Sequence, residues 1–398
     1  MSIFSESVPI RPDGLARGQV HSLVEHRSAY PAPATDHLHR DVTAAGLRGC
    51  GGASFPVTRK WDAAIEAGGR GIVVANGAES EPASSKDSAL LQLRPHLVLD
   101  GLSAVVRATH AKSGVVWLHQ GSIHSRAAID RALAERRAAG IFDPPIMITE
   151  GPARYLSGES SSIIHALSGG PALPRTLPVP AAIRGVGGRP TVVHNVETLV
   201  RVACIASGRD HEGGRLLTVA TPTTRTVLEA RPSDRLASLT SGLVGSRAAA
   251  VLLGGYGGMW YRWDDVAALP LSELGTKLGP GIVMTLPHDA CGVTASARII
   301  RYLAASSAKQ CGPCIFGLGE ITEVMDRIAA GRARRSDVAR LQQIAAAVAG
   351  RGACHHPDGA IRMLGSAIEV FSHEFGAHRR SQQCLRRHDI GTSGSRAA

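Results

Sequence analysis

The sequence predicts an α/β protein in which a mostly parallel sheet is followed by a small mixed sheet and then by a helical bundle. Between residues 71 and 149, short apolar runs alternate with segments of helical spacing, which is typical of parallel strands covered by helices on both faces. From residue 208, short β-branched runs alternate with turns over a stretch of β-grasp size. From residue 294 to residue 375, apolar residues recur at intervals of three and four, which indicates a bundle of helices.

These changes of pattern divide the chain into five segments. The first residues are rich in proline, serine and alanine and show little periodicity, whereas the last are rich in arginine, serine and glycine. We expect an irregular arm at 1–33, an α/β domain at 34–207, a β-grasp domain at 208–275, a helical bundle at 276–376 and a disordered basic tail at 377–398.

The predicted strands of the α/β domain are short apolar runs bounded by turn residues. They lie at 71–75, 115–119 and 145–149, and helices are expected at 36–45, 88–110 and 125–139. A further helix is expected within 191–199, with His194, Asn195 and Glu197 at its start. The small sheet should hold strands at 216–220, 224–229 and 250–253, and the bundle should hold helices at 294–307, 316–330, 336–349 and 360–375.

A glycine-rich stretch at 46–61, GLRGCGGASFPVTRKW, is the first candidate binding element. Because glycine has no Cβ, Gly49, Gly51 and Gly52 can turn successive amides toward a ligand and let it approach the backbone closely. Lys60 adds positive charge, and Phe55 offers a flat ring on which another ring can stack. These features suit an anionic phosphate group, and a glycine-rich surface turn is the structural alternative.

Polar and acidic residues follow the predicted strand at 71–75. They belong to the segment NGAESEP, which contains Asn76, Glu79, Ser80 and Glu81. In open α/β sheets, ligands bind just beyond the carboxyl ends of the strands, so these side chains stand where a site is expected.

A second glycine-containing segment, GPARYLSGESSSIIHAL at 151–167, leads into a predicted helix. It combines an aromatic residue, Tyr155, with Gly158 and with Glu159 in the first turn of the helix. The free amides of a helix N-terminus can receive an anion or a hydrogen-bond acceptor.

Seven cysteines, an odd number, argue against a disulfide framework and for metal or redox use of a subset. Cys311 and Cys314 form a C-x-x-C pair at a predicted helix start, and Cys354 returns later in the bundle. Thiolates are soft ligands, so these three side chains can converge on one metal centre. Cys50, in the cationic glycine loop, is a candidate for a thiol of lowered pKa.

The composition predicts a soluble globular protein. Hydrophobic residues make up 44% of the chain, and no uninterrupted apolar run approaches the roughly 18 residues of a membrane span. The N-terminus lacks the pattern of a secretory signal, so we expect a cytoplasmic location. The net charge of +11 comes mostly from scattered arginines with few aromatics between them, which argues against nucleic-acid binding and suits an acidic redox partner.

Taken together, these stretches resemble the NADH-binding flavoprotein subunit of respiratory complex I, that is, the family of F subunits of NADH-quinone oxidoreductase, with this chain as a divergent member. GLRGCGGASFPVTRKW is similar to its glycine-rich FMN and NADH loop, and NGAESEPASSKD to its acidic flavin and nicotinamide segment. YLSGESSSI and PTVVHNVETL are similar to two further flavin-binding segments. The resemblance implies a Rossmann-like FMN-binding domain, a soluble-ligand-binding β-grasp domain and a C-terminal helical bundle with an iron–sulfur site.

The resemblance also implies roles for individual residues. Gly49, Gly51, Gly52 and Lys60 would face the phosphate and ribityl side of FMN, and Asn76, Glu79, Ser80, Tyr155, Gly158, Glu159 and Asn195 would surround its isoalloxazine. Glu81 would be the catalytic residue that contacts the nicotinamide nucleotide, and Phe55 would stack on its adenine. A hydride would arrive at the flavin, and single electrons would leave through a cluster held by Cys311, Cys314 and Cys354.

The chain departs from the family pattern at several positions. Cys50 stands in place of an arginine, Ala78 of an aspartate and Ser160 of a glutamate, and Ala63 and Val179 stand in place of two aromatic residues that enclose adenine.

Ala308 replaces the first cysteine of a C-x-x-C-x-x-C motif. The three remaining thiolates can hold a [4Fe–4S] cluster whose fourth iron takes water, His355, His356 or Cys291. A [3Fe–4S] cluster, or a zinc ion with three cysteines and a histidine, is the alternative.

The leading functional hypothesis is an FMN and iron–sulfur oxidoreductase subunit that passes electrons from NAD(P)H to a partner protein. The partner would be a ferredoxin-like protein, a thioredoxin-like iron–sulfur subunit or a membrane cytochrome. Because two aromatic residues are lost, an electron-transfer subunit without nucleotide binding is an alternative. A catalytically silent structural paralogue is the alternative from another class.

Overall fold

The first sheet of the molecule is fully parallel. The structure is a computed structural model, and it describes residues 15, 18–209, 213–243 and 248–379. Four strands lie in the order β3-β2-β1-β4, and Val74 pairs with Val115 on one side and with Val193 on the other. The strands are β1 (Ile72–Asn76), β2 (Ser113–His119), β3 (Ile146–Gly151) and β4 (Thr191–Asn195). The prediction of a mostly parallel sheet is confirmed.

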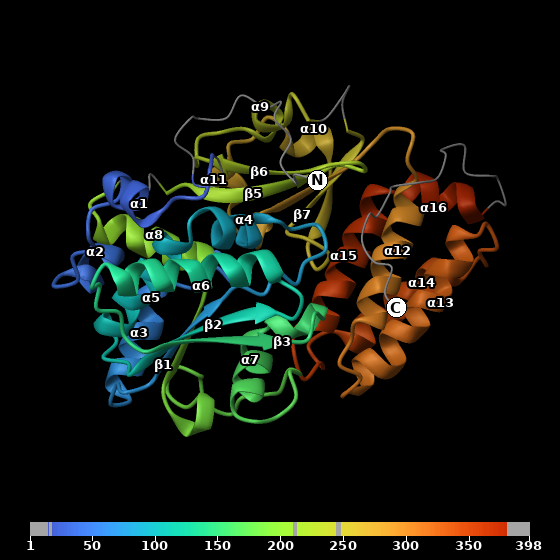
Figure 1. The fold of residues 1–398 in the computed structure, drawn as a ribbon. Coiled ribbons are helices and arrows are strands. Elements are labelled where there is room, and N and C mark those ends of the chain that lie inside the picture. Colours follow the sequence, from blue (N-terminus) through green and yellow to red (C-terminus); the bar gives the residue numbers. More distant parts are fainter. Residues whose placement is uncertain (1–14, 16–17, 210–212, 244–247, 380–398) are drawn as a thin grey trace.

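Helices cover both faces of this sheet, because successive side chains of a strand point to opposite faces (Figure 1). On one face, Val73 and Val116 belong to a buried cluster with helices α5 (Pro95–Ala108) and α8 (Val196–Ala206). On the other face, Val74 and Trp117 pack with Ile163 and Ile164 of α7 (Ser160–Leu167). The remaining helices and turns of this part are α2 (Leu38–Ala44), α3 (Val57–Glu66), α6 (Ile123–Ala138), the 3-10 turns η1 (Tyr155–Gly158) and η2 (Val186–Gly188), and α1 and α4, described below.

Two helix expectations for this part of the chain need correction. The helix expected within 191–199 forms, with Asn195 as the N-cap of α8 and Glu197 in its first turn, but it begins only at Val196, because the preceding β-branched run, which includes His194, forms β4. The helix expected at 88–110 is two helices, α4 (Lys86–Leu93) and α5, since Pro95 lacks the amide that a continuous helix needs and instead stands at the first turn of α5.

The arm expected to be irregular contains the short helix α1 (Leu23–Ala29). Ser22 and Glu25 cap it reciprocally, a local signal that the sequence carries. Asp100 of α5 accepts hydrogen bonds from the His26 ring and from Arg27, so α1 is held to the main domain. Residues 1–14, 16 and 17 of the expected arm lie outside the described residues.

The second sheet is mixed. Its five strands lie in the order β6-β5-β9-β7-β8, with only β5 and β9 parallel. They are β5 (Arg215–Ala220), β6 (Arg225–Ala230), β7 (Ala250–Leu253), β8 (Met259–Arg262) and β9 (Ile282–Leu286), with helices α9 (Leu236–Thr240), α10 (Trp263–Val266) and α11 (Leu271–Leu274) and the turn η3 (Gly275–Leu278). The predicted strands β5, β6 and β7 are confirmed, whereas the central strand β9 comes from the segment that we assigned to the bundle.

The bundle packs against one face of this second sheet. Leu252 and Trp260 share a buried cluster with the helices, and the Trp260 amide donates to Ser366 Oγ at 2.9 Å. The bundle holds α12 (Gly292–Ala305), the π-helical turn η4 (Pro313–Gly317), α13 (Leu318–Ala329), α14 (Asp337–Val348), α15 (His356–Val370) and α16 (Ser372–Arg379). The rest of the tail expected to be disordered lies outside the described residues.

In Figure 1 the second sheet lies across the top of the molecule, with the bundle at its side. Among the described residues, no helix has the length and apolar character of a membrane span.

Candidate functional site

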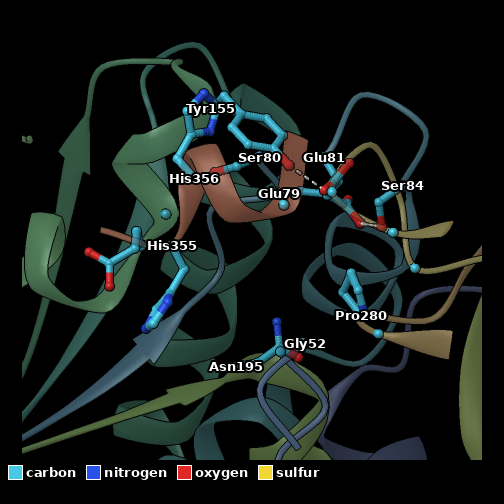
Figure 2. A pocket seen from close by; sticks show the side chains of 18 of the residues that line it. Gly52, Glu79, Ser80, Glu81, Ser84, Tyr155, Asn195, Pro280, His355 and His356 are labelled. Atoms are coloured by element: carbon cyan, nitrogen blue, oxygen red, sulfur yellow. Dashed lines mark hydrogen bonds between the residues drawn. The ribbon is translucent and has the colours of Figure 1, made fainter. Parts of the chain in front are cut away.

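One large cavity, of about 600 Å³, opens where the two sheets and the bundle meet (Figure 2). The first domain contributes the glycine loop, the ends of β1 and β4, and the turn η1. The second sheet contributes the loops around Gly257 and Pro280, and the bundle contributes His355, His356 and Arg362. Segments far apart in the chain therefore form one site at the carboxyl ends of parallel strands, as the sequence predicts.

Most of the residues predicted to form the site line this cavity. They are Gly51, Gly52, Asn76, Glu79, Ser80, Glu81, Tyr155, Gly158, Glu159 and Asn195. Three others, Gly49, Phe55 and Lys60, belong to the same loop and helix but do not line it. Phe55 is 44% exposed.

The glycine loop is held in place by its backbone. The Cys50 amide donates to Thr198 Oγ1 at 3.0 Å, and the Gly49 amide donates to the Phe55 carbonyl at 2.9 Å. Gly52 has a φ of 93°, a conformation that side-chain-bearing residues rarely adopt. The loop therefore presents bare backbone to the cavity.

The Cys50 thiol does not behave as expected. It is buried, and burial raises its pKa to about 11. The expectation of a lowered pKa was wrong, because desolvation and the nearby carboxylate of Glu197 outweigh the surrounding cations.

Lys60 lies on α3 beneath the loop, half-buried. Its Nζ donates to the Val193 carbonyl at 3.2 Å. No carboxylate pairs with it among the described residues, and burial lowers its pKa. A cation without a charged partner at this position suits an anionic ligand.

The Glu79 side chain is hydrogen-bonded to neighbouring residues of its own segment and of α4. Its two carboxylate oxygens accept hydrogen bonds from Ser84 Oγ at 2.6 Å and from the amides of Asp87 and Ser88 at 3.0 Å. These amides belong to the first turn of α4, where a negative charge is stabilised by the helix dipole. Glu79 therefore fixes the polar segment after β1 against α4.

Glu81 is enclosed by Tyr155 and by the loop at 254–258, which follows β7. Tyr155 Oη donates to Glu81 Oε1 at 2.6 Å, and the Tyr256 amide donates to Oε2 at 3.0 Å (Figure 2). Burial raises the pKa of Glu81, and these hydrogen bonds only partly offset the effect. Burial and the adjacent carboxylate also raise the pKa of Tyr155 well above its ordinary value.

A buried lysine completes the floor of the cavity, and the sequence reasoning missed it. Lys86 Nζ lies 2.7 Å from Asp87 Oδ1, 3.0 Å from Glu197 Oε2 and 3.2 Å from Asn195 Oδ1. Burial alone would lower the pKa of Lys86, but the two carboxylates raise it above its ordinary value. The available signal was a lysine, rare in this arginine-rich chain, directly after the acidic segment.

A histidine at the end of β2 contacts the cavity wall. His119 Nε2 lies 3.3 Å from Ser80 Oγ and 2.9 Å from Ser157 Oγ. Burial lowers the pKa of His119, so it is neutral near pH 7.

The three predicted cysteine ligands lie near one another in the bundle, but no three or more histidine, cysteine, aspartate or glutamate side chains of the described residues are arranged to hold a metal ion. The Cys314 thiol interacts with Cys311 through a hydrogen bond and with Cys354 electrostatically. Burial and the two neighbouring thiols raise the pKa of Cys314 to about 12, as expected where sulfurs crowd without a compensating cation. The six cysteines of the described part are free thiols.

Two segments of the chain match models of known protein families. Residues 42–204 match the family model described as the Nuo51 FMN-binding domain. Residues 294–378 match the NADH-ubiquinone oxidoreductase-F iron-sulfur binding region.

Most of the chain is also similar to F subunits of NADH-quinone oxidoreductase from several bacteria. The chain is 29% identical to the F subunit of NADH-quinone oxidoreductase from Escherichia coli (strain K12), over 88% of this chain and 86% of that protein. It is 28% identical to the F 2 subunit of NADH-quinone oxidoreductase from Rhizobium meliloti (strain 1021), over 88% of this chain and 90% of that protein. A solved NAD+-reducing [NiFe]-hydrogenase in the H2-reduced state superposes with a TM-score of 0.77 at 26% identity, over 92% of this chain and 67% of that chain.

Proposed function

Because the chain is a divergent member of the family of F subunits of NADH-quinone oxidoreductase, we propose that it oxidises a nicotinamide nucleotide at FMN held in the cavity and passes the electrons through an iron–sulfur cluster to a partner protein. One observation carries the proposal. His355 and His356, which directly follow Cys354, line the same cavity as Gly52 and Asn195 (Figure 2). The flavin site and the thiol site therefore share a wall, which suits electron transfer between them.

The residues of the cavity fit FMN. Gly51 and Gly52 offer bare amides, and Lys60 offers a cation with no charged partner among the described residues, so a phosphate can be held at this end. Asn76 and Asn195 stand at the ends of neighbouring strands, where the ring system would lie. When bound, FMN accepts two electrons as a hydride and releases them singly.

The chain's own residues hold and shape this site. Glu79 and Lys86 fix the two polar strand ends, and Glu159 caps α7 through the amides of Ser161 and Ser162. We assign Glu81 to contact with the nicotinamide nucleotide and Phe55 to stacking on its adenine. Gly49, Ser80, Tyr155 and Gly158 would complete the FMN site.

Cys311, Cys314 and Cys354 would hold the iron–sulfur cluster, which would accept single electrons from the flavin. A zinc ion fits less well, because a single ion needs its ligands around one point. No group of three or more histidine, cysteine, aspartate or glutamate side chains in the described part of the chain is arranged in that way. A cluster places each thiolate on a different iron and tolerates a wider spacing.

The proposed partner is a separate redox protein that accepts the electrons. The relatives are subunits by name, so a separate redox protein would receive the electrons. A ferredoxin-like protein, a thioredoxin-like iron–sulfur subunit or a membrane cytochrome would serve, and we place the encounter in the cytoplasm.

Anaerobic purification tests the proposal. The full chain should carry a flavin absorption band, and NADH or NADPH should bleach it within the mixing time of a spectrophotometer. With ferricyanide as acceptor, the protein should then turn over. A protein without flavin, or a flavin that only dithionite bleaches, would contradict nucleotide oxidation.

A second function, electron transfer without a nucleotide, is favoured by the enclosure of Glu81. Both of its carboxylate oxygens are occupied by Tyr155 and the Tyr256 amide, so a nucleotide would have to displace one of them. Ala63 and Val179 also stand where aromatic stacking would be expected. A flavin that a reduced ferredoxin bleaches and that NADH and NADPH leave oxidised would establish this function instead.

A further inference from the structure

The chain offers three thiols to a cluster that has four irons. Cys311 and Cys314 flank the start of η4, and Cys354 precedes α15. Cys314 is buried, whereas Cys311 and Cys354 are partly exposed. The segment from Ala308 to Gln310, directly before Cys311, offers no fourth thiol, because Ala308 carries no ligand atom and Lys309 and Gln310 are exposed.

The other side chains that could complete the set are engaged elsewhere. Cys291 caps the opposite end of α12, and its Sγ lies 3.4 Å from His378 Nε2. Since α12 has 14 residues, this thiol lies about 20 Å along the helix from the Ala308 end. It cannot serve as the fourth ligand.

The two histidines after Cys354 are also unsuitable. His356 is buried, and its Nε2 is bonded to the Leu303 carbonyl at 2.8 Å. His355 is fully exposed and projects into the cavity assigned to the flavin, with Nδ1 3.7 Å from Asp358 (Figure 2).

A buried hydroxyl next to Ala308 points to an additional ligand. Ser307 Oγ is inaccessible to solvent and has no hydrogen-bond partner among the described residues. Buried hydroxyl groups in proteins are normally paired, and a water bound at this corner provides the missing partner.

We propose that the iron at the Ala308 corner has no protein ligand and binds a small exogenous ligand, water or hydroxide at rest and a small thiolate or cyanide when offered. The inference rests on the iron–sulfur part of the proposed function. The cluster would then be chemically asymmetric. Three irons would be held by thiolates, and the fourth would exchange its small ligand with solvent.

Oxidation releases the exchangeable iron. A [4Fe–4S]²⁺ cluster that loses Fe²⁺ and one electron leaves [3Fe–4S]¹⁺, and the electron goes to an added oxidant such as ferricyanide. Fe²⁺ and a reductant reverse the step. A cluster with four thiolates resists it, because every iron is held by the protein.

The test uses the full chain, purified anaerobically, with iron content and the EPR spectrum as readouts. Ferricyanide with a chelator should remove about one of the four irons from the wild type and produce the EPR signal of an oxidised three-iron cluster. Under the same treatment, Ala308→Cys should keep all four irons and give no EPR signal of a three-iron cluster. Ala305→Cys, an exposed thiol at the end of α12, is the matched control and should behave as the wild type does.

A probe of the wild type keeps the inference testable if Ala308→Cys does not fold. Cyanide or mercaptoethanol should shift the EPR spectrum of the reduced cluster. No shift, or four irons that survive ferricyanide in the wild type, would overturn the inference. An altered EPR spectrum of the reduced cluster in Ser307→Ala, together with no effect of cyanide on the wild-type spectrum, would identify the serine as the ligand and also overturn the inference.

The flavin separates this failure from that of the proposed function. A protein with FMN that NADH reduces, but without iron after reconstitution, overturns the open-iron inference and leaves nucleotide oxidation standing. A protein without either cofactor overturns both.

Discussion

Tyr155 and Glu81 come from elements 74 residues apart and share a 2.6 Å hydrogen bond at the centre of the cavity. Tyr155→Phe leaves Glu81 Oε1 without that donor in a buried site, which costs about 1–3 kcal/mol when the carboxylate is charged. Denaturant unfolding at neutral pH measures the loss. Tyr261→Phe is the control, because among the described residues its hydroxyl is bonded only to Met259 Sδ, at 3.7 Å. Equal stability of both variants would show that the bond contributes nothing.

The raised pKa of Glu81 predicts a pH-dependent stability. The folded state holds a proton that the unfolded state releases near the ordinary value of 4.5, so this contribution is full below 4.5 and declines as the pH rises toward the raised pKa. Glu81→Gln removes the decline, and its stability relative to the wild type should increase with pH above 4.5. The exposed Glu273→Gln controls for the removal of a surface carboxylate. Parallel pH profiles of wild type and Glu81→Gln would rule out the raised pKa.

Lys86 is predicted to contribute strongly to the stability of the folded protein. Lys86→Met leaves the buried carboxylate of Asp87 without its cation and leaves Glu197 with the more distant Arg201, at 3.6 Å, and such a loss costs about 3–5 kcal/mol. The denaturation midpoint should fall accordingly. Lys112→Met, on the surface, should change it little. If Lys86→Met is as stable as Lys112→Met, the carboxyl groups of Asp87 and Glu197 are neutralised by protonation instead.

Gly255 allows the loop at 254–258 to pack closely against Glu81. A Cβ at this position would lie 2.6 Å from Glu81 Cδ, and the φ of 79° is itself unfavourable for alanine. Gly331→Ala, with a φ of 71° and open space around it, is a matched control that should cost only the backbone strain of about 1–2 kcal/mol. Gly255→Ala should cost more and should also lower kcat/KM for the nucleotide. Equal costs would show that Glu81 moves aside freely.

The sequence predicts the parallel sheet and the bundle because their signals are local. Apolar runs such as Ile72–Asn76 are short and bounded, and their period is clear. The break at Pro95 and the capping box at Ser22 were local signals as well, and they were missed. The strand β4 was not readable, since its β-branched run continues without a turn into the amphipathic helix α8.

Most residues that line the cavity could be predicted from the sequence, whereas their contacts with one another could not. Strand ends and glycine loops identify which residues face the cavity. The pairing of Tyr155 with Glu81, and of Lys86 with Glu197, depends on contacts between distant segments that no spacing encodes. The strand β9 likewise joins the second sheet through pairing with β5, far away in the chain.

Lys60 provides the sharpest test of the proposed phosphate site. Its ammonium group is half-buried and, among the described residues, bonded only to the Val193 carbonyl, so its loss removes little from the folded protein. A charge-assisted hydrogen bond to phosphate contributes about 1.5–3 kcal/mol, so Lys60→Gln should weaken FMN binding about tenfold to a hundredfold. The neighbouring Arg59→Gln, exposed on the same helix, should leave FMN affinity unchanged because its side chain faces solvent. Quenching of FMN fluorescence measures both dissociation constants, and thermal unfolding of the FMN-free proteins checks that the folds are equally stable. Equal FMN affinity in the two variants would place the phosphate elsewhere, since a cation in contact with it cannot be removed without loss of binding.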